Sequence, residues 1–310
     1  MSLINKIFQY SIILIIIIFI LYINILVILR FNFDFTYNNK ITRHSQDIFF
    51  PHKIFIETHG GGNNTLESFS KSIEWNIESL ETDVWLTKDK ILVLIHADSY
   101  GNIDYYLNQK GNLKELTWKQ LSKLRTKKDN FKIPRLESLL KLAKNKIFIN
   151  LEIKDPRVNL VFPKIINLIE KYDFFDQITI SSFYHKYFDQ IAKYNKKSEK
   201  KLIFGFIYRR NITNYDYSKK GHTLNIYWNE ITKEVCDKAH NNGMAVIAWF
   251  GITDNDTLEN YKQLINLGVD AICCNYPLIA KNYRDNIYNN DIFSYLNIFV
   301  ENIKKVFFII

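Results

Sequence analysis

The feature that most constrains the fold of this 310-residue chain is an alternation of short β-rich runs with helical patterns. Runs of β-branched and aromatic residues are separated by segments whose apolar residues recur at helical spacing. The eight runs are residues 54–58, 79–85, 147–153, 177–183, 202–207, 222–228, 244–250 and 270–276. Eight strands that each lead into a helix predict an α/β fold of the TIM (β/α)8 barrel class, in which parallel strands close into a cylinder.

One further β-rich run breaks the alternation. ILVLIH, residues 91–96, follows the second strand after a turn too short for a parallel crossover, which takes about a dozen residues. The sequence therefore predicts an antiparallel hairpin that leaves the barrel after strand two and returns. Its return brings His96 to the level of Glu81 and Asp83. A small insertion, residues 97–132, then precedes the next helix.

The amino-terminal segment differs in kind from the rest of the chain. Residues 7–29 carry no charge, and at about 1.5 Å per residue a helix of this length exceeds a hydrocarbon core of roughly 30 Å. We expect one transmembrane helix that serves as an uncleaved, single-pass anchor. The predicted regions are the anchor at 1–35, a linker at 36–53, the barrel at 54–282 and an apolar, amphipathic tail at 283–310.

Charge and cysteine content narrow the classes of partner. The net charge of +9 comes from 41 Lys and Arg against 32 Asp and Glu, without a dense basic block, which argues against a nucleic-acid surface. A positive field favours phosphates or an acidic membrane face. Three cysteines form neither a disulfide framework nor a zinc motif. The side of the membrane stays open, because basic residues after the anchor favour a cytosolic barrel whereas Asn211 and Asn255 begin glycosylation sequons.

Charged residues gather at the predicted carboxyl ends of the strands, where TIM barrels carry their chemistry. Glu81 and Asp83 are two residues apart on strand two, so both side chains face the same side. Glu152 and Lys154 repeat this spacing on strand three. Three converging carboxylates repel one another unless a divalent cation joins them, and oxygen ligands favour Mg²⁺ or Ca²⁺.

Two histidines complete the predicted cluster. His59 follows strand one and His96 ends the hairpin, so the two rings would flank the metal as general base and general acid on either side of a phosphorus centre. Lys154 would neutralise a phosphate oxygen. Trp249 and Asn275 stand at the ends of strands seven and eight.

Over about residues 54–280 the sequence resembles the glycerophosphodiester phosphodiesterase family, which shares a barrel superfamily with phosphatidylinositol-specific phospholipase C. The motifs that carry the resemblance are NNTLESF, LETDVWLTKDKILVLIH, IPRLESLL, NLEIK, ISSF, AWF and DAICCNYP. The resemblance implies metal ligands Glu81, Asp83 and Glu152, the acid–base pair His59 and His96, a phosphate contact from Lys154 and a pocket lined by Trp249. It also implies cleavage of a glycerophosphodiester or lysophospholipid to glycerol 3-phosphate or lysophosphatidic acid plus an alcohol.

The sequence departs from the family pattern next to the first histidine. Gly60 stands where the family has Arg, and Asn63 stands where it has Glu. We expect Gly60, Gly61 and Asn63 to contact substrate, with backbone N–H groups taking the place of the Arg. Two alternatives stay open: an impaired barrel that binds phospholipid headgroups, and a lyase-type enzyme whose product is a cyclic phosphate.

Overall fold

The computed structural model describes one part of the chain, with short gaps: Phe19 and residues 54–210, 212, 215–216 and 221–287. The chain divides into two units, Met1–Lys40 and Ile41–Ile310, and the fold that can be described is that of the second. The predicted anchor, apart from Phe19, the linker and the tail beyond residue 287 lie outside the described residues. Within the described part, no helix combines the length and the apolar character that crossing a bilayer requires.

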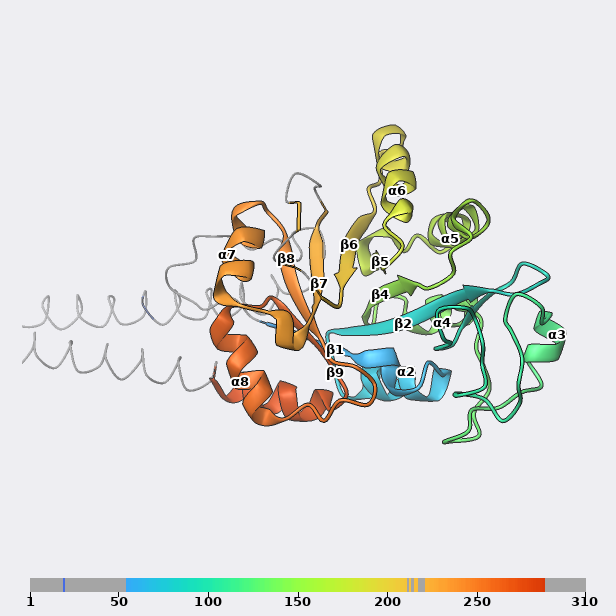
Figure 1. Cartoon of the computed structure of the whole chain (residues 1–310), viewed down its shortest axis with the longest axis horizontal. Helices are drawn as coiled ribbons and strands as arrows, with labels where there is room; N and C mark the ends of the chain where they lie inside the picture. Colours follow the sequence, from blue (N-terminus) through green and yellow to red (C-terminus); the bar gives the residue numbers. More distant parts are fainter. Residues whose placement is uncertain (1–18, 20–53, 211, 213–214, 217–220, 288–310) are drawn as a thin grey trace, which may run out of the picture. The chain divides into compact units, whose positions relative to one another are not determined.

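In the described part of the chain, eight parallel strands form the predicted barrel (Figure 1). They are β1 (Phe55–Thr58), β2 (Ser79–Leu86), β4 (Phe148–Ile153), β5 (Ile178–Ser182), β6 (Ile203–Tyr208), β7 (Thr223–Tyr227), β8 (Ala245–Trp249) and β9 (Ala271–Cys274). Each strand pairs with its neighbour, and β1 pairs with both β9 and β2, which closes the sheet. The TIM barrel prediction is confirmed.

The hairpin prediction is also confirmed. β3 (Leu92–Leu94) pairs antiparallel with the outer half of β2, with Leu94 opposite Val84. The N–H of Ile95 then donates to the carbonyl of Asp83 at 3.1 Å, so the next residue, His96, returns to the level of the β2 carboxylates. The insertion covers the hairpin with a separate small core around Trp85, which is fully buried.

Helices form the outer layer of the barrel. They are α2 (Leu66–Glu74), α4 (Leu136–Ala143), α5 (Val158–Tyr172), α6 (Lys186–Lys197), α7 (Lys233–Asn241), α8 (Leu258–Leu267) and a helical stretch at 277–287, while the short α3 (Trp118–Leu121) belongs to the insertion. The 3-10 turns are η2 (His59–Gly62), η3 (Phe175–Gln177) and η5 (Trp228–Glu230). Threonine side chains cap several helices: Thr65, Thr232 and Thr257 accept hydrogen bonds from the first turns of α2, α7 and α8.

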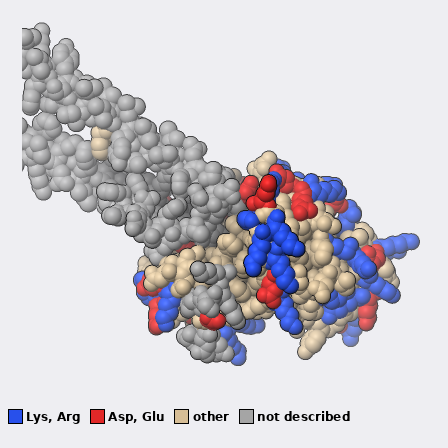
Figure 2. Space-filling model, turned by 90° about the horizontal axis from the view of Figure 1, so that it is seen from above, with Lys and Arg blue, Asp and Glu red and all other residues tan. Residues whose placement is uncertain are grey.

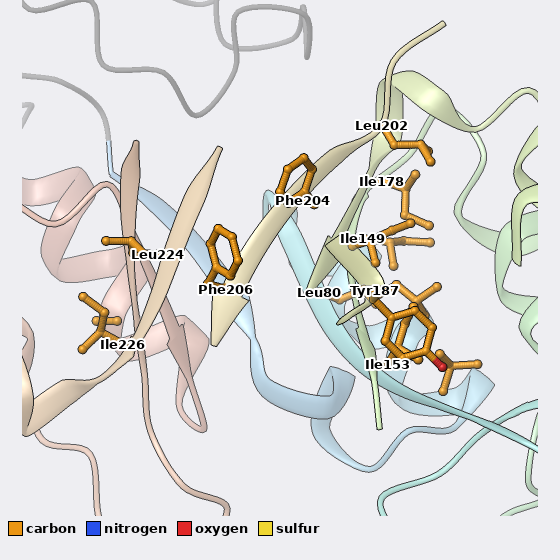
Figure 3. Close-up of a cluster of buried hydrophobic side chains, with 14 of the residues drawn as sticks. Leu80, Ile149, Ile153, Ile178, Tyr187, Leu202, Phe204, Phe206, Leu224 and Ile226 are labelled. Atoms are coloured by element: carbon orange, nitrogen blue, oxygen red, sulfur yellow. The ribbon is translucent and has the colours of Figure 1, made fainter. Parts of the chain in front are cut away.

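The main core lies between the strands and the helices (Figure 3). Leu80, Ile149 and Ile178 face outward from neighbouring strands and are buried in this layer. Because successive side chains on a strand alternate in direction, Glu81 and Asn150 face the barrel interior instead. The outward residues hold the barrel together, and the inward ones are free to be polar.

The amino-terminal end of the barrel, called here the bottom, is closed by a buried ion pair and by a buried contact between a histidine and a carboxylate. Arg284, on the stretch 277–287, is 1% exposed; its guanidinium donates to the Ile54 carbonyl at 2.8 Å and pairs with Glu78 at 2.8 Å. His240 and Asp270 form a second buried contact, at 2.7 Å.

On the molecular face in Figure 2, basic and acidic side chains are interspersed.

Candidate active site

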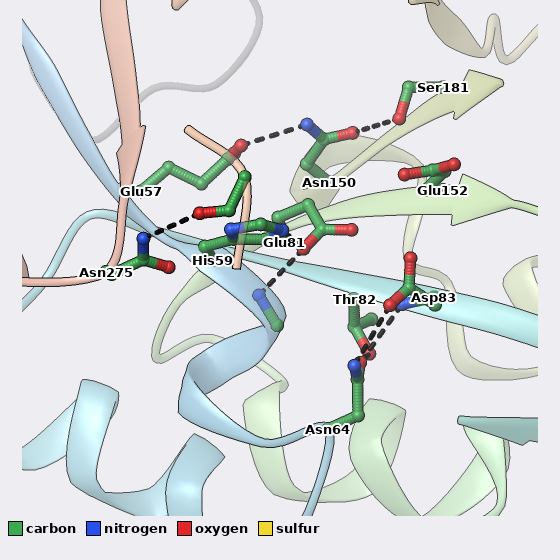
Figure 4. Close-up of polar contacts among 12 residues, drawn as sticks. Glu57, His59, Asn64, Glu81, Thr82, Asp83, Asn150, Glu152, Ser181 and Asn275 are labelled. Atoms are coloured by element: carbon green, nitrogen blue, oxygen red, sulfur yellow. Dashed lines mark hydrogen bonds and ion pairs between the residues drawn. The ribbon is translucent and has the colours of Figure 1, made fainter. Parts of the chain in front are cut away.

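Three carboxylates meet at the carboxyl end of the barrel. Glu81 and Asp83 come from β2 and Glu152 from β4, where Asp83 and Glu152 are register partners. All three side chains are buried, and one oxygen from each lies within 4.8 Å of the others. Figure 4 shows Asp83 and Glu152 side by side at the strand ends, with Glu81 turned toward the same space. The structure therefore brings together the three carboxylates that the sequence singled out.

One cation partly balances these charges. Lys154 Nζ lies 2.8 Å from Glu152 Oε1 and 3.2 Å from Asp83 Oδ1. Burial alone raises the pKa of Asp83, but the ammonium group of Lys154 brings that pKa below its ordinary value. Burial raises the pKa of Glu152, and burial together with the other two carboxylates raises the pKa of Glu81 well above its usual range. A single lysine does not offset three buried acids.

The cluster fits a divalent cation. Glu81 Oε1 is buried and has no hydrogen-bond partner in the structure, although a buried carboxylate oxygen normally has one. Its neighbours are oxygen donors, the ligand type that Mg²⁺ and Ca²⁺ prefer. A bound cation would satisfy this oxygen and remove the repulsion that raises the pKa of Glu81.

His59 lies next to this cluster, at the start of η2. Its Nε2 is 4.0 Å from Glu81 Oε2, and burial lowers the pKa of the ring, although Asp83 counteracts part of the shift. The following N–H, of Gly60, donates to Glu81 Oε2 at 2.7 Å. Gly60 has a φ of +57°, and a Cβ there would lie 3.2 Å from the Asn64 side chain, so a side chain such as Arg would be strained. Gly61 continues the same turn.

His96 lies near Asp83 and is covered by the insertion. Tyr106 packs against its ring at a centroid distance of 4.6 Å. Burial lowers the pKa of His96 to about 4, with Asp83 opposing the shift. Its Nδ1 is buried without a hydrogen-bond partner in the structure. Burial therefore favours the neutral form of both predicted histidines, and both rings lie near enough to Asp83 to interact with its charge.

Asn64 is a positioning residue that the sequence analysis did not single out. Its Nδ2 donates to Asp83 Oδ2 at 3.0 Å, and its Oδ1 accepts from the Asp83 N–H at 3.1 Å and from the Thr82 hydroxyl. Its φ of 55° is left-handed, which asparagine tolerates better than most residues. The available signal was the second of two asparagines that follow the glycine-rich turn. The residue fixes both the backbone and the carboxylate of Asp83.

Two of the residues expected to contact substrate have partners elsewhere. The Asn63 side chain donates to Asp129 of the insertion, and the N–H of Gly60 is taken by Glu81. Trp249 stands at the end of β8, where its indole N–H donates to the Tyr208 carbonyl at 3.3 Å and its ring packs against Phe183. Lys154 remains the cation closest to the carboxylates among the predicted site residues.

A second polar layer lies below the carboxylates, inside the barrel. Glu57 accepts hydrogen bonds from Ser79 at 2.7 Å and from Asn150 at 2.9 Å, and Asn150 accepts from Ser181 at 2.7 Å (Figure 4). Burial raises the pKa of Glu57. These residues were not predicted, although Glu57 stands two residues before His59 and therefore shares its inward face.

Asn275, at the end of β9, joins two loops of the site. Its Nδ2 donates to the Gly251 carbonyl at 2.9 Å and to Asp256 Oδ1 at 3.0 Å, while Asp256 Oδ2 also accepts from the Tyr261 hydroxyl at 2.6 Å. This network holds the loop after β8 against the end of β9. Asn275 lies beside His59 in Figure 4.

Residues 50–279 match the model of the glycerophosphoryl diester phosphodiesterase family. The chain belongs to this family. Its members are phosphoric diester hydrolases, and the match spans the barrel and all of the site residues described above. The resemblance drawn from the strand-end motifs is thereby confirmed.

Relatives within the family cover almost the same region. A glycerophosphodiester phosphodiesterase of Caldanaerobacter subterraneus subsp. tengcongensis is 28% identical over 244 residues, which is 73% of this chain and 95% of the relative. One from Bacillus altitudinis is 27% identical over 247 residues, 75% of this chain and 98% of the relative. The structure of an Oleispira antarctica phosphodiesterase in complex with the product sn-glycerol-3-phosphate has a TM-score of 0.65 at 19% identity, covering 74% of this chain and 96% of that one.

Proposed function

We propose that the protein hydrolyses glycerophosphodiesters or lysophospholipids to an alcohol and a glycerol phosphomonoester, either glycerol 3-phosphate or lysophosphatidic acid. The observation that carries the proposal is the buried cluster of three carboxylates and a lysine between two neutral histidines. The names of the two bacterial relatives and the product bound to the Oleispira enzyme support the same reaction.

The three carboxylates are the proposed metal ligands, for Mg²⁺ or Ca²⁺. A divalent cation in this cluster would offset the negative charge of the phosphodiester. Lys154 would contact a phosphate oxygen from the same side, because it already lies between Asp83 and Glu152. Trp249 would line the pocket, and Gly61 and Asn63 would contact the substrate. Gly60 would act indirectly, because its N–H already holds Glu81.

Proton transfer falls to the two histidines. One ring would accept the proton of the attacking oxygen, and the other would donate a proton to the departing alcohol oxygen. Burial keeps both rings neutral in the free protein, so one must gain a proton before the alcohol can leave. A phosphodiester anion bound between the rings would raise both pKa values and so favour that protonation.

The uncharged run at residues 7–29 supports a location at a membrane, with one amino-terminal anchor. An anchored enzyme would meet lipid-derived phosphodiesters at high local concentration.

The test is hydrolysis of glycerophosphocholine and lysophosphatidylcholine by the full-length protein with Mg²⁺ or Ca²⁺. We expect His59→Ala to lower kcat/KM by about two to four orders of magnitude while the thermal transition is kept. His222→Gln, at the bottom of the barrel, is the matched control and should remain active. A folded wild-type protein that cleaves neither substrate with either metal would overturn the proposal.

A second candidate function is a barrel that binds phospholipid headgroups without cleaving them. It is favoured by Gly60, which supplies no cationic side chain beside His59. A binder should keep its headgroup affinity in His59→Ala, whereas the enzyme should lose turnover. Phosphorus NMR of the product separates hydrolysis from lyase chemistry, since the lyase would leave a cyclic phosphate.

A further inference from the structure

The exposed large apolar side chains gather at the carboxyl end of the barrel. Among the described residues, nine of the ten such side chains lie there, and the tenth, Trp75, ends α2 at the bottom. Seven of the nine stand on loops or first helical turns that follow parallel strands, and two stand in the insertion. Six of them define the apolar rim: Tyr100, Tyr105, Phe183, Ile252, Tyr276 and Ile279.

The rim adjoins the candidate active site. Tyr105 packs on Tyr106 at a centroid distance of 4.8 Å, and Tyr106 packs on His96. Phe183 packs edge-on against Trp249 at 6.0 Å. Two of the exposed rings therefore contact aromatic residues that lie at the same end of the barrel as the carboxylates, and one of these, Tyr106, covers His96.

The loops that carry the rim are tied to one another. The Tyr184 hydroxyl donates to the Ser99 carbonyl at 3.4 Å, which joins the loop after β5 to the insertion. The amide of Asn275 joins the loop of Ile252 to that of Tyr276 through the Gly251 carbonyl. Hydrogen bonds thus join the loops of the rim in two pairs.

Exposed apolar side chains that gather at one end of a domain indicate an interaction site, and the composition of the rim favours a lipid surface. Three of the six rim residues are tyrosines, whose rings suit an apolar phase while their hydroxyls stay hydrated. Arg209 and Arg210 are exposed just after β6, at the same end of the barrel. Together with the net charge of +9, they favour a surface that carries phosphate groups.

We propose that the apolar rim docks onto a lipid–water interface, and that the enzyme draws lysophospholipids from that interface into the site. The substrate assignment rests on the proposed function, whereas the docking does not. With the rim against the lipid, the phosphodiester of a lysophospholipid can reach the carboxylates while its acyl chain stays in the apolar phase.

The chain between the predicted anchor and the barrel is long enough for this orientation. Residues 30–53 separate the uncharged run from Ile54, at the bottom of the barrel. Extended, that segment reaches roughly 80 Å, against a diameter of roughly 45 Å for a domain of this size. An anchor that joins the bottom of the barrel is therefore compatible with docking through the opposite end.

A kinetic test compares two substrates for the full-length protein reconstituted in phosphatidylcholine vesicles. The rim variant Ile252→Ser/Tyr276→Ser/Ile279→Ser should lose at least about tenfold in kcat/KM for vesicle-borne lysophosphatidylcholine, since three apolar anchors are removed. Hydrolysis of water-soluble glycerophosphocholine should stay within about twofold, because none of the three residues contacts the carboxylate cluster. Trp75→Ser, which removes the exposed ring at the bottom, should change neither rate. An equal loss on both substrates, or no loss on either, would overturn the proposal.

A spectroscopic test reads docking without turnover. A spin label at Ile279→Cys should become more accessible to oxygen and less accessible to a water-soluble nickel complex when the protein is in vesicles, while a label at Trp75→Cys should not. If the wild type cleaves no substrate but the labels behave as expected, the proposed function fails and the docking stands. If the accessibility of the label at Ile279→Cys is the same with and without vesicles, the docking proposal is wrong. A rim that instead pairs two copies of the chain, seen as a dimer that the triple variant dissociates, would also overturn it.

Discussion

The two ends of the barrel treat buried charge in opposite ways. At the bottom, the buried polar groups have partners: Arg284 pairs with Glu78, and Asp270 hydrogen-bonds with the ring of His240. At the carboxyl end, three buried acids share one lysine, and Glu81 Oε1 is left without a hydrogen bond. Paired buried charges hold a fold together, whereas a concentration of unpaired ones is tolerated where it serves chemistry.

The turns at the two ends of the barrel also differ in what their left-handed residues do. At the bottom, tight turns use left-handed residues such as Asn76, Asn145 and Gly268, which end helices without further function. At the carboxyl end, Gly60 and Asn64 also adopt positive φ, but both hydrogen-bond metal-cluster carboxylates. The same backbone device therefore ends helices at one end and positions side chains at the other.

The largest effect is expected from removing one acid of the cluster. We expect Glu81→Gln to lower kcat/KM for glycerophosphocholine by at least about a thousandfold, or roughly 4 kcal/mol of transition-state stabilisation. The free energy of unfolding without metal should stay equal or rise, because a buried charge that repels its neighbours is gone while the Gly60 N–H keeps an acceptor. Steady-state kinetics and urea unfolding measure the two quantities.

Glu67→Gln provides the matched control, since Glu67 is exposed in the first turn of α2. It should leave both quantities unchanged. If Glu81→Gln keeps its activity, Glu81 is not required for catalysis. If it loses stability as well as activity, Glu81 supports the fold, as the paired residues at the bottom do.

The second prediction addresses the bottom itself. Arg284→Met should lower the free energy of unfolding by about 3 kcal/mol, because it leaves Glu78 partly buried without its partner and removes a hydrogen bond to the Ile54 carbonyl. The kcat of the folded fraction should not change. Urea unfolding followed by circular dichroism measures the first effect, and turnover normalised to folded protein measures the second.

The control for Arg284→Met lies on the same helical stretch. Lys281 pairs with Asp285 at 3.4 Å and is 24% exposed, so Lys281→Met should cost less than about 1 kcal/mol. Equal losses for the two substitutions would mean that burial adds nothing to the pair at the bottom.

The sequence predicted those parts of both ends that depend on strand periodicity. The i, i+2 spacing of Glu81 and Asp83 placed both inside the barrel, and the short turn before residues 91–96 predicted the return of His96. Such patterns involve residues that are close in the sequence, so they can be recognised without the tertiary structure.

Contacts between distant segments could not be predicted in this way. Tyr106 covers His96 only because the insertion folds back over the hairpin, and Asn63 meets Asp129 across 66 positions of sequence. Gly60 was expected to face substrate, yet a left-handed φ turns its N–H toward Glu81. Likewise, Arg284 reaches Ile54 across 230 positions, and no periodicity signals that partnership.

A third prediction sharpens the contrast through metal binding. Ca²⁺ or Mg²⁺ at about a hundred times its Kd should raise the free energy of unfolding by roughly 2 to 3 kcal/mol, because it binds the assembled carboxylates and not the unfolded chain. The gain should vanish in Glu81→Gln and persist in Arg284→Met. Urea unfolding with and without EDTA measures it, and the same gain in Glu81→Gln would show that the ion binds elsewhere.

The smallest predicted effect concerns an exposed pair in the helical layer, between the first turn of α4 and the last turn of α5. Glu137 Oε1 lies 2.8 Å from Lys171 Nζ and accepts from the Tyr172 hydroxyl at 2.6 Å; the Lys171 hydrogen bond contributes most to lowering the pKa of Glu137 to about 2. A folded-state pKa below the ordinary 4.5 gives stability that is fully present above about pH 4.5 and is lost as the pH falls toward 2. Glu137→Gln should therefore lower the melting temperature at pH 7 by only roughly 1–2 °C, because water screens the pair, and the difference should disappear near pH 2. Calorimetric scans from pH 7 down to the lowest pH at which both proteins fold would measure this difference in melting temperature. If Glu137→Gln destabilised the protein as much as Arg284→Met, greater exposure to solvent would not make this pair weaker than the buried pair at the bottom.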